Sequence, residues 1–452
     1  MKKLIALLGV AALAAGCSDD AQPLASAPQE PDLYVWGVDN DGDGIDDGTE
    51  SDLANTYAPV LWMPNLITRD EAGNGVSGDW TWPATVDWYL PKVRMRFHHS
   101  NCPDHAILEQ GTITSTSLIA QRHQRATTWL ACSHSGTTFG SDGEGGFDNK
   151  NAFFLQATDD DLVHPGVRDA SGWKAYTHVY RNDMGGISIQ YWFFYAYNDF
   201  ISGYNHEGDW EHITVHLDAS QQRHSVTYAA HYDPKTYEAW QVAWYGVTHP
   251  HVWVADGSHA SYSFQGECQA FWPEGFSDSC WLNPDQRWFT WDGGKGSDQG
   301  LQGGGLVNIG EMPLAGTSRR PMPGQEWIRY SGRWGEVGLE ETAWDENTSG
   351  PKGPGYQDSW NERLVTGCGE ASCTPVTAAY ISHFTGADCT GTESYYTAYY
   401  NYDGVRRSWN GTGMAGTTLR TVTNRSYKDS SGACYNAWSS GNTLSGFVTI
   451  YR

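Results

Sequence analysis

The stretch NHEGDWEHITVHLD (residues 205–218) gathers titratable side chains at the start of a pattern that is typical of a β-strand. Asp209 and Glu211 are two residues apart, so in a strand they share one face while Trp210 takes the other. Two carboxylates on one face can bind a cation or act as an acid–base pair. The elements that position them decide between these two kinds of chemistry.

Further donors lie close to this stretch. His206 precedes the carboxylates across a turn, and the aromatic segment IQYWFFYAYND upstream ends in Asp199. A strand–loop–strand hairpin would bring both ends of its loop together, and such a set suits a hard or borderline divalent cation. The alternative is a hydrogen-bonded polar turn. We predict that Ca²⁺, Mg²⁺ or Mn²⁺, with Zn²⁺ after them, binds Asp199, His206, Asp209 and Glu211.

A second acidic stretch, DNDGDGIDDGTE, has the spacing of a calcium-binding loop. Gly44 stands at position 6, where the backbone turns sharply, and Ile45 offers a carbonyl. The stretch resembles the thrombospondin type 3 repeats of secreted bacterial proteins, and the alternative is a solvated acidic linker. Its expected role is structural, at the junction between a tether and the folded body. The predicted Ca²⁺ ligands are Asp39, Asp41, Asp43, Ile45, Asp47 and Glu50.

The N-terminus has the features of a secretory signal. Lys2 and Lys3 precede an apolar run that is too short to span a bilayer, and the run ends in LAAGC. This ending resembles a bacterial lipobox, which implies lipidation of Cys17; the alternative is an ordinary signal peptide. With Ser18 next, the resemblance implies an outer-membrane lipoprotein or an extracellular protein of the bacterial cell envelope. The membrane is then a partner through the N-terminal lipid.

The nine cysteines agree with secretion. Without Cys17, eight remain, which is an even number in an oxidising compartment. Sequence does not fix their connectivity, so we take local pairing as the simplest hypothesis. None of the pairs has the spacing of a zinc ribbon. The predicted disulfides are Cys102–Cys132, Cys268–Cys280, Cys368–Cys373 and Cys389–Cys434.

Composition and charge limit the class of protein. The formal net charge is −25, so nucleic acid, which needs a basic face, is not an expected partner. Aromatic residues make up 13% of the chain and glycines number 52, which favours strands joined by turns. We predict an all-β fold with a central β-sandwich with long loops and a small disulfide-stapled C-terminal β domain.

The expected order of segments follows from these features. A lipoprotein signal peptide covers residues 1–16 and a flexible tether covers 17–38. The calcium-binding loop covers 39–50, the sandwich domain 51–365, and a Cys-containing β-rich domain 366–452.

Five motifs carry a family resemblance: YAPVLWM, ISIQYWFFYAYN, HEGDWEHITVHLD, DGSHASY and GPKGPGYQDSW. In this order they resemble the vacuolar protein sorting-associated protein 62 family over about residues 51–360. The resemblance implies that His259, in DGSHASY, faces the same cleft as the hairpin; the alternative is a histidine bonded to backbone in a turn. His231, in AAHYD, is a second cleft candidate with a structural alternative.

The hairpin also resembles the necrosis- and ethylene-inducing peptide-like proteins. These are secreted β-sandwich toxins that bind a divalent cation and recognise sphingolipid head groups. Their hallmark, Gly-His-Arg-His-Asp-Trp-Glu, places its first His on His206, its Asp on Asp209 and its Glu on Glu211, and an upstream Asp ligand falls on Asp199. The second hallmark His falls on Gly208. The resemblance implies a cation site and a lipid head group as ligand.

Three functional hypotheses follow. The first is a lipid-anchored, cation-binding β-sandwich protein that recognises a membrane head group or glycan and is toxin-like. The second is a metal-dependent hydrolase that uses the same cleft, with an open coordination position for water. The third is a structural surface protein. The sequence has no nucleophile elbow, phosphate loop or Ser/His/Asp signature, so no catalytic residue is assigned.

Overall fold

A computed structural model describes most of the central part of the chain. The described residues are 37–67, 79–99, 102–124, 138–144, 151–182, 184–200, 205–231, 234–268, 278–280, 282–291, 300–337, 349–360 and short strands between 379 and 448. The predicted signal peptide, the tether up to residue 36 and the lipidation at Cys17 lie outside them. Among the helices of the described part, none has the length and apolar character that a membrane-spanning helix needs.

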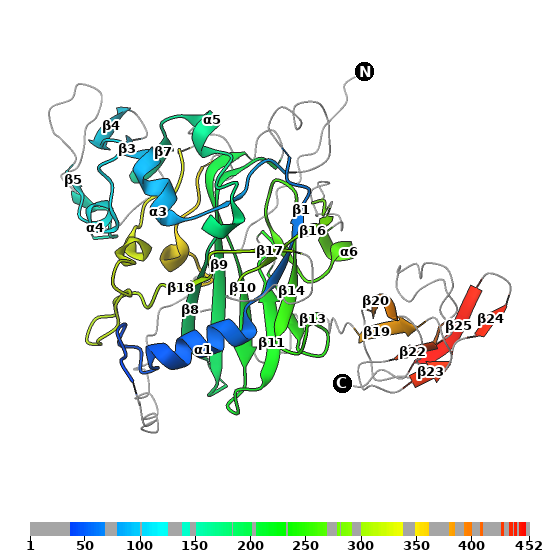
Figure 1. Cartoon of the computed structure of the whole chain (residues 1–452). Helices are drawn as coiled ribbons and strands as arrows, with labels where there is room; N and C mark the ends of the chain where they lie inside the picture. Colours follow the sequence, from blue (N-terminus) through cyan, green and yellow to red (C-terminus); the bar gives the residue numbers. More distant parts are fainter. Residues whose placement is uncertain are drawn as a thin grey trace, which may run out of the picture. The chain divides into compact units, whose positions relative to one another are not determined.

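A seven-stranded sheet carries the hairpin that the sequence predicted (Figure 1). Its strand order is β12-β11-β10-β9-β8-β18, and the short β2 pairs with β9. The long central strands β9 and β10 are antiparallel, and β18 runs parallel to β8 at one edge. The strands are β2 (Pro83–Ala84), β8 (Ala175–Arg181), β9 (Ile187–Asn198), β10 (His206–Leu217), β11 (Arg223–Tyr228), β12 (Lys235–Glu238) and β18 (Leu306–Asn308).

A six-stranded sheet packs against one face of the seven-stranded sheet. Its order is β13-β14-β1-β16-β17, and β15 pairs with β14. Buried side chains of both sheets form one cluster, the sandwich core, which includes Leu61, Val252 and Trp288 from the six-stranded sheet and Tyr191 and Ile213 from the other. The strands are β1 (Val60–Pro64), β13 (Trp244–Tyr245), β14 (His249–Val254), β15 (Ser261–Tyr262), β16 (Leu282–Phe289) and β17 (Leu301–Gln302).

The opposite face of the seven-stranded sheet is also covered. Trp192, Phe194 and Trp210 project into a second cluster, the outer core, together with Met95 and many other buried side chains. Two small sheets, β4-β3-β7 and β5-β6, lie in this part of the chain. Their strands are β3 (Val93–His99), β4 (Cys102–Leu108), β5 (Arg122–Gln124), β6 (Thr138–Gly140) and β7 (Asn151–Ala157). Because both faces of the sheet are covered, β9 is buried along nearly its whole length rather than at alternate residues.

Helices are short. The longest, α1 (Asp47–Tyr57), begins where the Asp46 side chain accepts a hydrogen bond from the Thr49 backbone N–H. It contributes Leu53 and Tyr57 to the sandwich core. The other helical segments are α3 (Val86–Tyr89), η1 (Leu90–Lys92), α4 (Ser115–Ile119), α5 (Asp160–Val163), η2 (Ala170–Gly172), α6 (Gln265–Cys268), η3 (Glu326–Arg329) and η4 (Pro354–Tyr356).

The C-terminal part of the chain also forms strands. One sheet has the order β20-β19-β22-β23 and another has the order β21-β25-β24. Their bounds are β19 (Ala379–Phe384), β20 (Glu393–Tyr399), β21 (Arg407–Trp409), β22 (Ser426–Lys428), β23 (Cys434–Asn436), β24 (Trp438–Ser440) and β25 (Thr443–Val448). The predicted all-β class is confirmed, since strands in several sheets dominate.

The disulfide Cys268–Cys280 is present, as predicted. It joins the end of α6 to the segment before β16, and both cysteines are fully buried. The other predicted pairs involve side chains outside the described residues.

Candidate functional site

The β9–β10 hairpin positions the carboxylates of the opening motif. Asp209 lies opposite Tyr195 and Glu211 lies opposite Phe193, on the face that forms the sandwich core. Trp210 lies on the other face and packs 4.8 Å from Phe194, ring centre to ring centre. The two carboxylates thus share one face of β10 and Trp210 lies on the other, as the sequence predicted. Titratable groups thus enter the sandwich beside apolar side chains, where each needs a partner.

Asp209 has such a partner in His259. The Nδ1 atom of His259 is 2.8 Å from Asp209 Oδ2, and its Nε2 atom is 3.0 Å from Asp79 Oδ2. The ring stacks on Tyr195 with 3.8 Å between the centres, and only 1% of the residue is exposed. Burial lowers the pKa of His259, but the Asp79 and Asp209 carboxylates outweigh this effect and raise it to about 9. The site thus holds an imidazolium between two carboxylates at neutral pH.

Backbone groups fix the turn that carries His259. Asp79 accepts hydrogen bonds from the N–H groups of Gly257 and Thr81, at 3.0 and 2.8 Å. The Asp199 backbone N–H donates to the Gly257 carbonyl at 3.0 Å. His259 itself has a φ of 53°, in the left-handed region that a non-glycine residue adopts only at a cost. The turn is therefore strained and held by the hairpin loop on one side and Asp79 on the other.

The four predicted cation ligands are not gathered into one coordination shell. Asp199 accepts hydrogen bonds from Trp80 Nε1 and Asn205 Nδ2, at 2.7 and 2.8 Å. His206 Nδ1 lies 2.8 Å from the Gly208 carbonyl oxygen. Two groups of described residues bring three ligand atoms within 4.8 Å of one another, and neither group contains any of these four residues. A cation at this hairpin stays a prediction.

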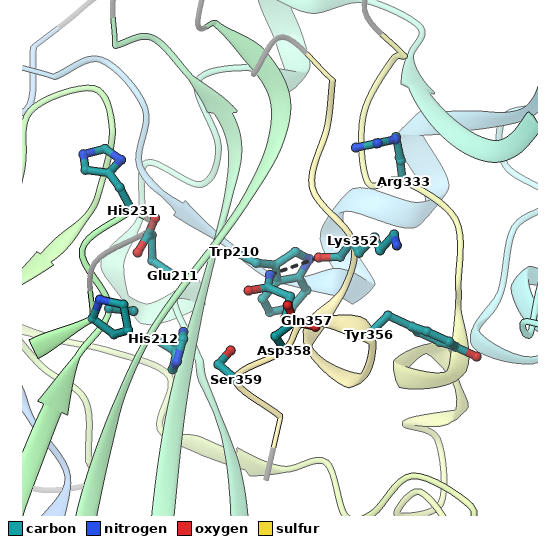
Figure 2. Close-up of a pocket in the computed structure, with 12 residues that line it drawn as sticks. Trp210, Glu211, His212, His231, Arg333, Lys352, Tyr356, Gln357, Asp358 and Ser359 are labelled. Carbon is teal, nitrogen blue, oxygen red and sulfur yellow. Dashed lines mark hydrogen bonds between the residues drawn. The ribbon is translucent and has the colours of Figure 1, made fainter. Parts of the chain in front are cut away.

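A pocket with a volume of about 640 Å³ opens beside Glu211 (Figure 2). Figure 2 shows Glu211 and His231 on one side of the strand and Arg333, Lys352 and Tyr356 on the other. Side chains of both charges line it, so the pocket suits a polar ligand. The lining residues are Trp210, Glu211, His212, Ala229, His231, Pro234, Arg333, Lys352, Tyr356, Gln357, Asp358 and Ser359.

Glu211 is the unusual carboxyl of this pocket. Burial, followed by the neighbouring Asp209 and Asp278 carboxylates, raises its pKa well above the usual value. No hydrogen bond reaches its carboxyl from the described part of the chain, although Asp278 nearby accepts from His231 Nε2 at 2.7 Å, from Ser258 Oγ at 2.9 Å and from the Tyr262 hydroxyl. Glu211 is thus the group that a ligand could satisfy.

Sequence reasoning identified part of this site. The opening motif indicated Asp209 and Glu211, and two other motifs indicated His231 and His259; His231 lines the pocket, and His259 lies buried on Asp209. It missed Asp79, which stands alone in the sequence SGDW, with no spacing to mark it. It also missed Arg333 and Lys352, because a basic residue in a loop carries no signal of the pocket that it will face.

The acidic loop folds around its own carboxylates. Asp39 accepts hydrogen bonds from the N–H groups of Gly42 and Gly44, at 2.6 and 3.1 Å. Ligand atoms of Asp39, Asp41 and Asp43 lie within 4.8 Å of one another. Asp47 directs both oxygens to Asn40, at 2.8 Å from its backbone nitrogen and 2.6 Å from Nδ2. The loop therefore gathers three of the predicted ligands, while Asp47 supports the backbone.

Two carboxylates of this loop are buried without full partners. Asp41 Oδ2 and Glu50 Oε1 have no hydrogen-bond partner, although Asp41 is 0% and Glu50 is 1% exposed. Burial, with the neighbouring carboxylates, raises the pKa of Asp41 to about 8 and that of Glu50 to about 10. Burial also raises the pKa of Asp43 to about 7. A bound cation would satisfy the unpartnered oxygens and remove the repulsion, so these residues fit a metal ion.

Comparison with known proteins gives a partial structural similarity. A crystal structure described as necrosis and ethylene inducing protein 2, from the causal agent of cocoa's witches' broom disease, matches with 22% identity and a TM-score of 0.17. The match covers 20% of this chain and 42% of that one, and a score this low carries no argument about function. No family model matches the chain, and no curated protein does. The resemblance to the vacuolar protein sorting-associated protein 62 family stays a prediction.

Proposed function

We propose that this chain is a binding protein that recognises a polar, hydroxyl-rich group, either a membrane head group or a glycan, in the pocket beside Glu211. The supporting observation is the pocket itself: the carboxyl of Glu211, which receives no hydrogen bond from the described residues, lines it on one side of the strand, and Arg333, Lys352 and Tyr356 line it on the other. Hydroxyl groups satisfy such a lining because each both donates and accepts hydrogen bonds. Lipidation at Cys17, an envelope location and membership of the vacuolar protein sorting-associated protein 62 family are part of the proposal and rest on the sequence motifs.

Calcium has a structural role in this proposal. Asp39, Asp41, Asp43 and Glu50 would hold Ca²⁺ at the start of α1, away from the ligand. Support comes from the two buried oxygens that lack partners and from the clustering of three carboxylates. An ion there would stabilise the N-terminal junction of the sandwich without taking part in recognition.

Substitution of Glu211 tests the recognition step. Glu211→Gln keeps the shape of the side chain but replaces its carboxyl by an amide, and we expect binding to weaken about 10-fold or more, since a buried polar group left without its partner costs about 1–3 kcal/mol. The probes are a glycan array and phosphatidylcholine vesicles with and without a glycosylated ceramide. Glu238→Gln, which makes the same change of side chain at an exposed position on β12, is the matched control.

The outcomes separate the hypotheses. Wild-type protein that binds no glycan and no vesicle, or Glu211→Gln that binds as tightly as Glu238→Gln, would contradict the proposal. Mass spectrometry of bound glycans after incubation addresses the hydrolase hypothesis, because only an enzyme would shorten them.

A further inference from the structure

A group of side chains that could hold a metal ion lies outside both the pocket and the acidic loop. Asp160 stands in α5 and His164 directly follows that helix, whereas Glu207 belongs to β10. One ligand atom from each lies within 4.8 Å of the others. His164 Nε2 is 3.3 Å from Glu207 Oε1 and 3.8 Å from Asp160 Oδ1. Two carboxylates and an imidazole nitrogen therefore converge from two separate elements.

The two buried members of the group are held in place before any ion binds. The Ala157 backbone N–H donates to both oxygens of Glu207, at 3.3 and 3.2 Å. The His164 ring stacks on Tyr197 with 4.2 Å between the centres and 10° between the planes. Only 7% of His164 is exposed. Packing and hydrogen bonds of this kind fix the ligand geometry that a metal site requires.

The carboxylates of this group repel one another. Glu336 interacts electrostatically with Glu207 and with Asp160, which adds a third carboxylate, and Arg96 and Arg94 offset part of this repulsion at Glu336. In the part of the chain that the structure describes, no lysine or arginine forms an ion pair with any of the three. Carboxylates that repel one another in this way gain from a shared cation. Asp160 and Glu336 are exposed, so an ion can enter from solvent.

We propose that Asp160, His164 and Glu207 bind one Zn²⁺ ion, with Glu336 as a carboxylate that can approach as a fourth ligand. One imidazole with two or three carboxylates suits a four-coordinate zinc ion. Ca²⁺ requires six to eight oxygen ligands, which this group does not offer. This site is separate from the calcium loop and does not depend on the function proposed for the pocket.

Zinc titration of the full chain tests this site. Isothermal titration with Zn²⁺ is carried out in saturating Ca²⁺, which fills the acidic loop. The wild type should show one zinc site more than Glu207→Gln. This variant retains an acceptor for the Ala157 N–H, so the backbone contact is preserved. Asp160→Asn should weaken this site about 10-fold or more, since even changes beyond the ligands cost about 10- to 100-fold. Asp161→Asn is the matched control, because it is the adjacent exposed acid and lies outside the group.

A second readout reports the ligands directly. Co²⁺ in place of Zn²⁺ should give a visible absorption band in wild-type protein and in Asp161→Asn, and this band should be lost in Glu207→Gln. Equal zinc stoichiometry and affinity in the wild type, Asp160→Asn and Glu207→Gln would overturn the proposal. So would a loss in Asp161→Asn as large as that in Asp160→Asn, because the effect would then be one of general surface charge.

Discussion

At the scale of single residues, His259 has the clearest consequence for pH. Its pKa is about 9 in the folded chain and about 6.5 in the unfolded chain, so the folded state binds more protons between these values. The stability that the ion pairs contribute is therefore fully present below pH ~6.5 and is lost as the pH rises through 9. With 1.36 kcal/mol per unit, the contribution is on the order of 3 kcal/mol. Urea unfolding between pH 6 and 9.5, in saturating Ca²⁺, measures it.

Two substitutions isolate this effect. His259→Gln should be less stable than the wild type at pH 6 and should lose most of the decline toward pH 9.5. His224→Gln, a half-buried position on β11 outside the sandwich core, should keep the decline of the wild type. If all three proteins lose the same stability between pH 6 and 9.5, His259 is not the group responsible.

At the scale of elements, strand β10 depends on a glycine at position 208. Gly208 has a φ of +65°, and a Cβ atom there would lie 2.3 Å from the Trp334 carbonyl oxygen. Gly208→Ala should therefore destabilise the fold by more than ~2 kcal/mol, from backbone strain together with the clash. Gly246 has a similar φ of +61° but open space around it, so Gly246→Ala should cost only about 1–2 kcal/mol. Equal losses in thermal or urea unfolding would show that the contact with Trp334 is unimportant.

The same strand shows how far the sequence can predict this protein. A period of two correctly separates Asp209 and Glu211 from Trp210, because side-chain alternation is a local property of a strand. His259 is 50 residues further along, and its insertion between Asp79 and Asp209 depends on how three segments pack. Glu207 stands inside the opening motif, yet its partner His164 comes from another element. Local spacing thus predicts which face of a strand a side chain occupies. Pairs of residues that meet only through tertiary packing leave no pattern in the sequence.

At the scale of the whole molecule, the acidic loop links calcium to stability. The raised pKa values of Asp41, Asp43 and Glu50 mean that the calcium-free folded state holds protons that the unfolded state has released. Without calcium, stability should therefore fall as the pH rises from about 4.5 through 7 to 10. Because Glu50 accepts a hydrogen bond from Asn308 at 2.8 Å, the loop also joins α1 to the end of β18. Calcium binding in the loop should thus affect the stability of the body of the sandwich as well as that of its N-terminal end.

Calcium should then stabilise the protein more at pH 8 than at pH 5, because only ionised carboxylates bind the ion. At about 100 times the dissociation constant, the expected gain at pH 8 is about 2.7 kcal/mol. Thermal melting of dialysed protein, with and without Ca²⁺ at the two pH values, measures this gain. Glu50→Gln removes the cost of protonating this buried carboxyl on folding, so it should match or exceed the calcium-free wild type at pH 8 and gain much less from calcium. Asp52→Asn, an exposed change in the same helix, should respond as the wild type does. A melting temperature that calcium leaves unchanged in wild-type protein at pH 8 would show that the loop is a solvated acidic linker.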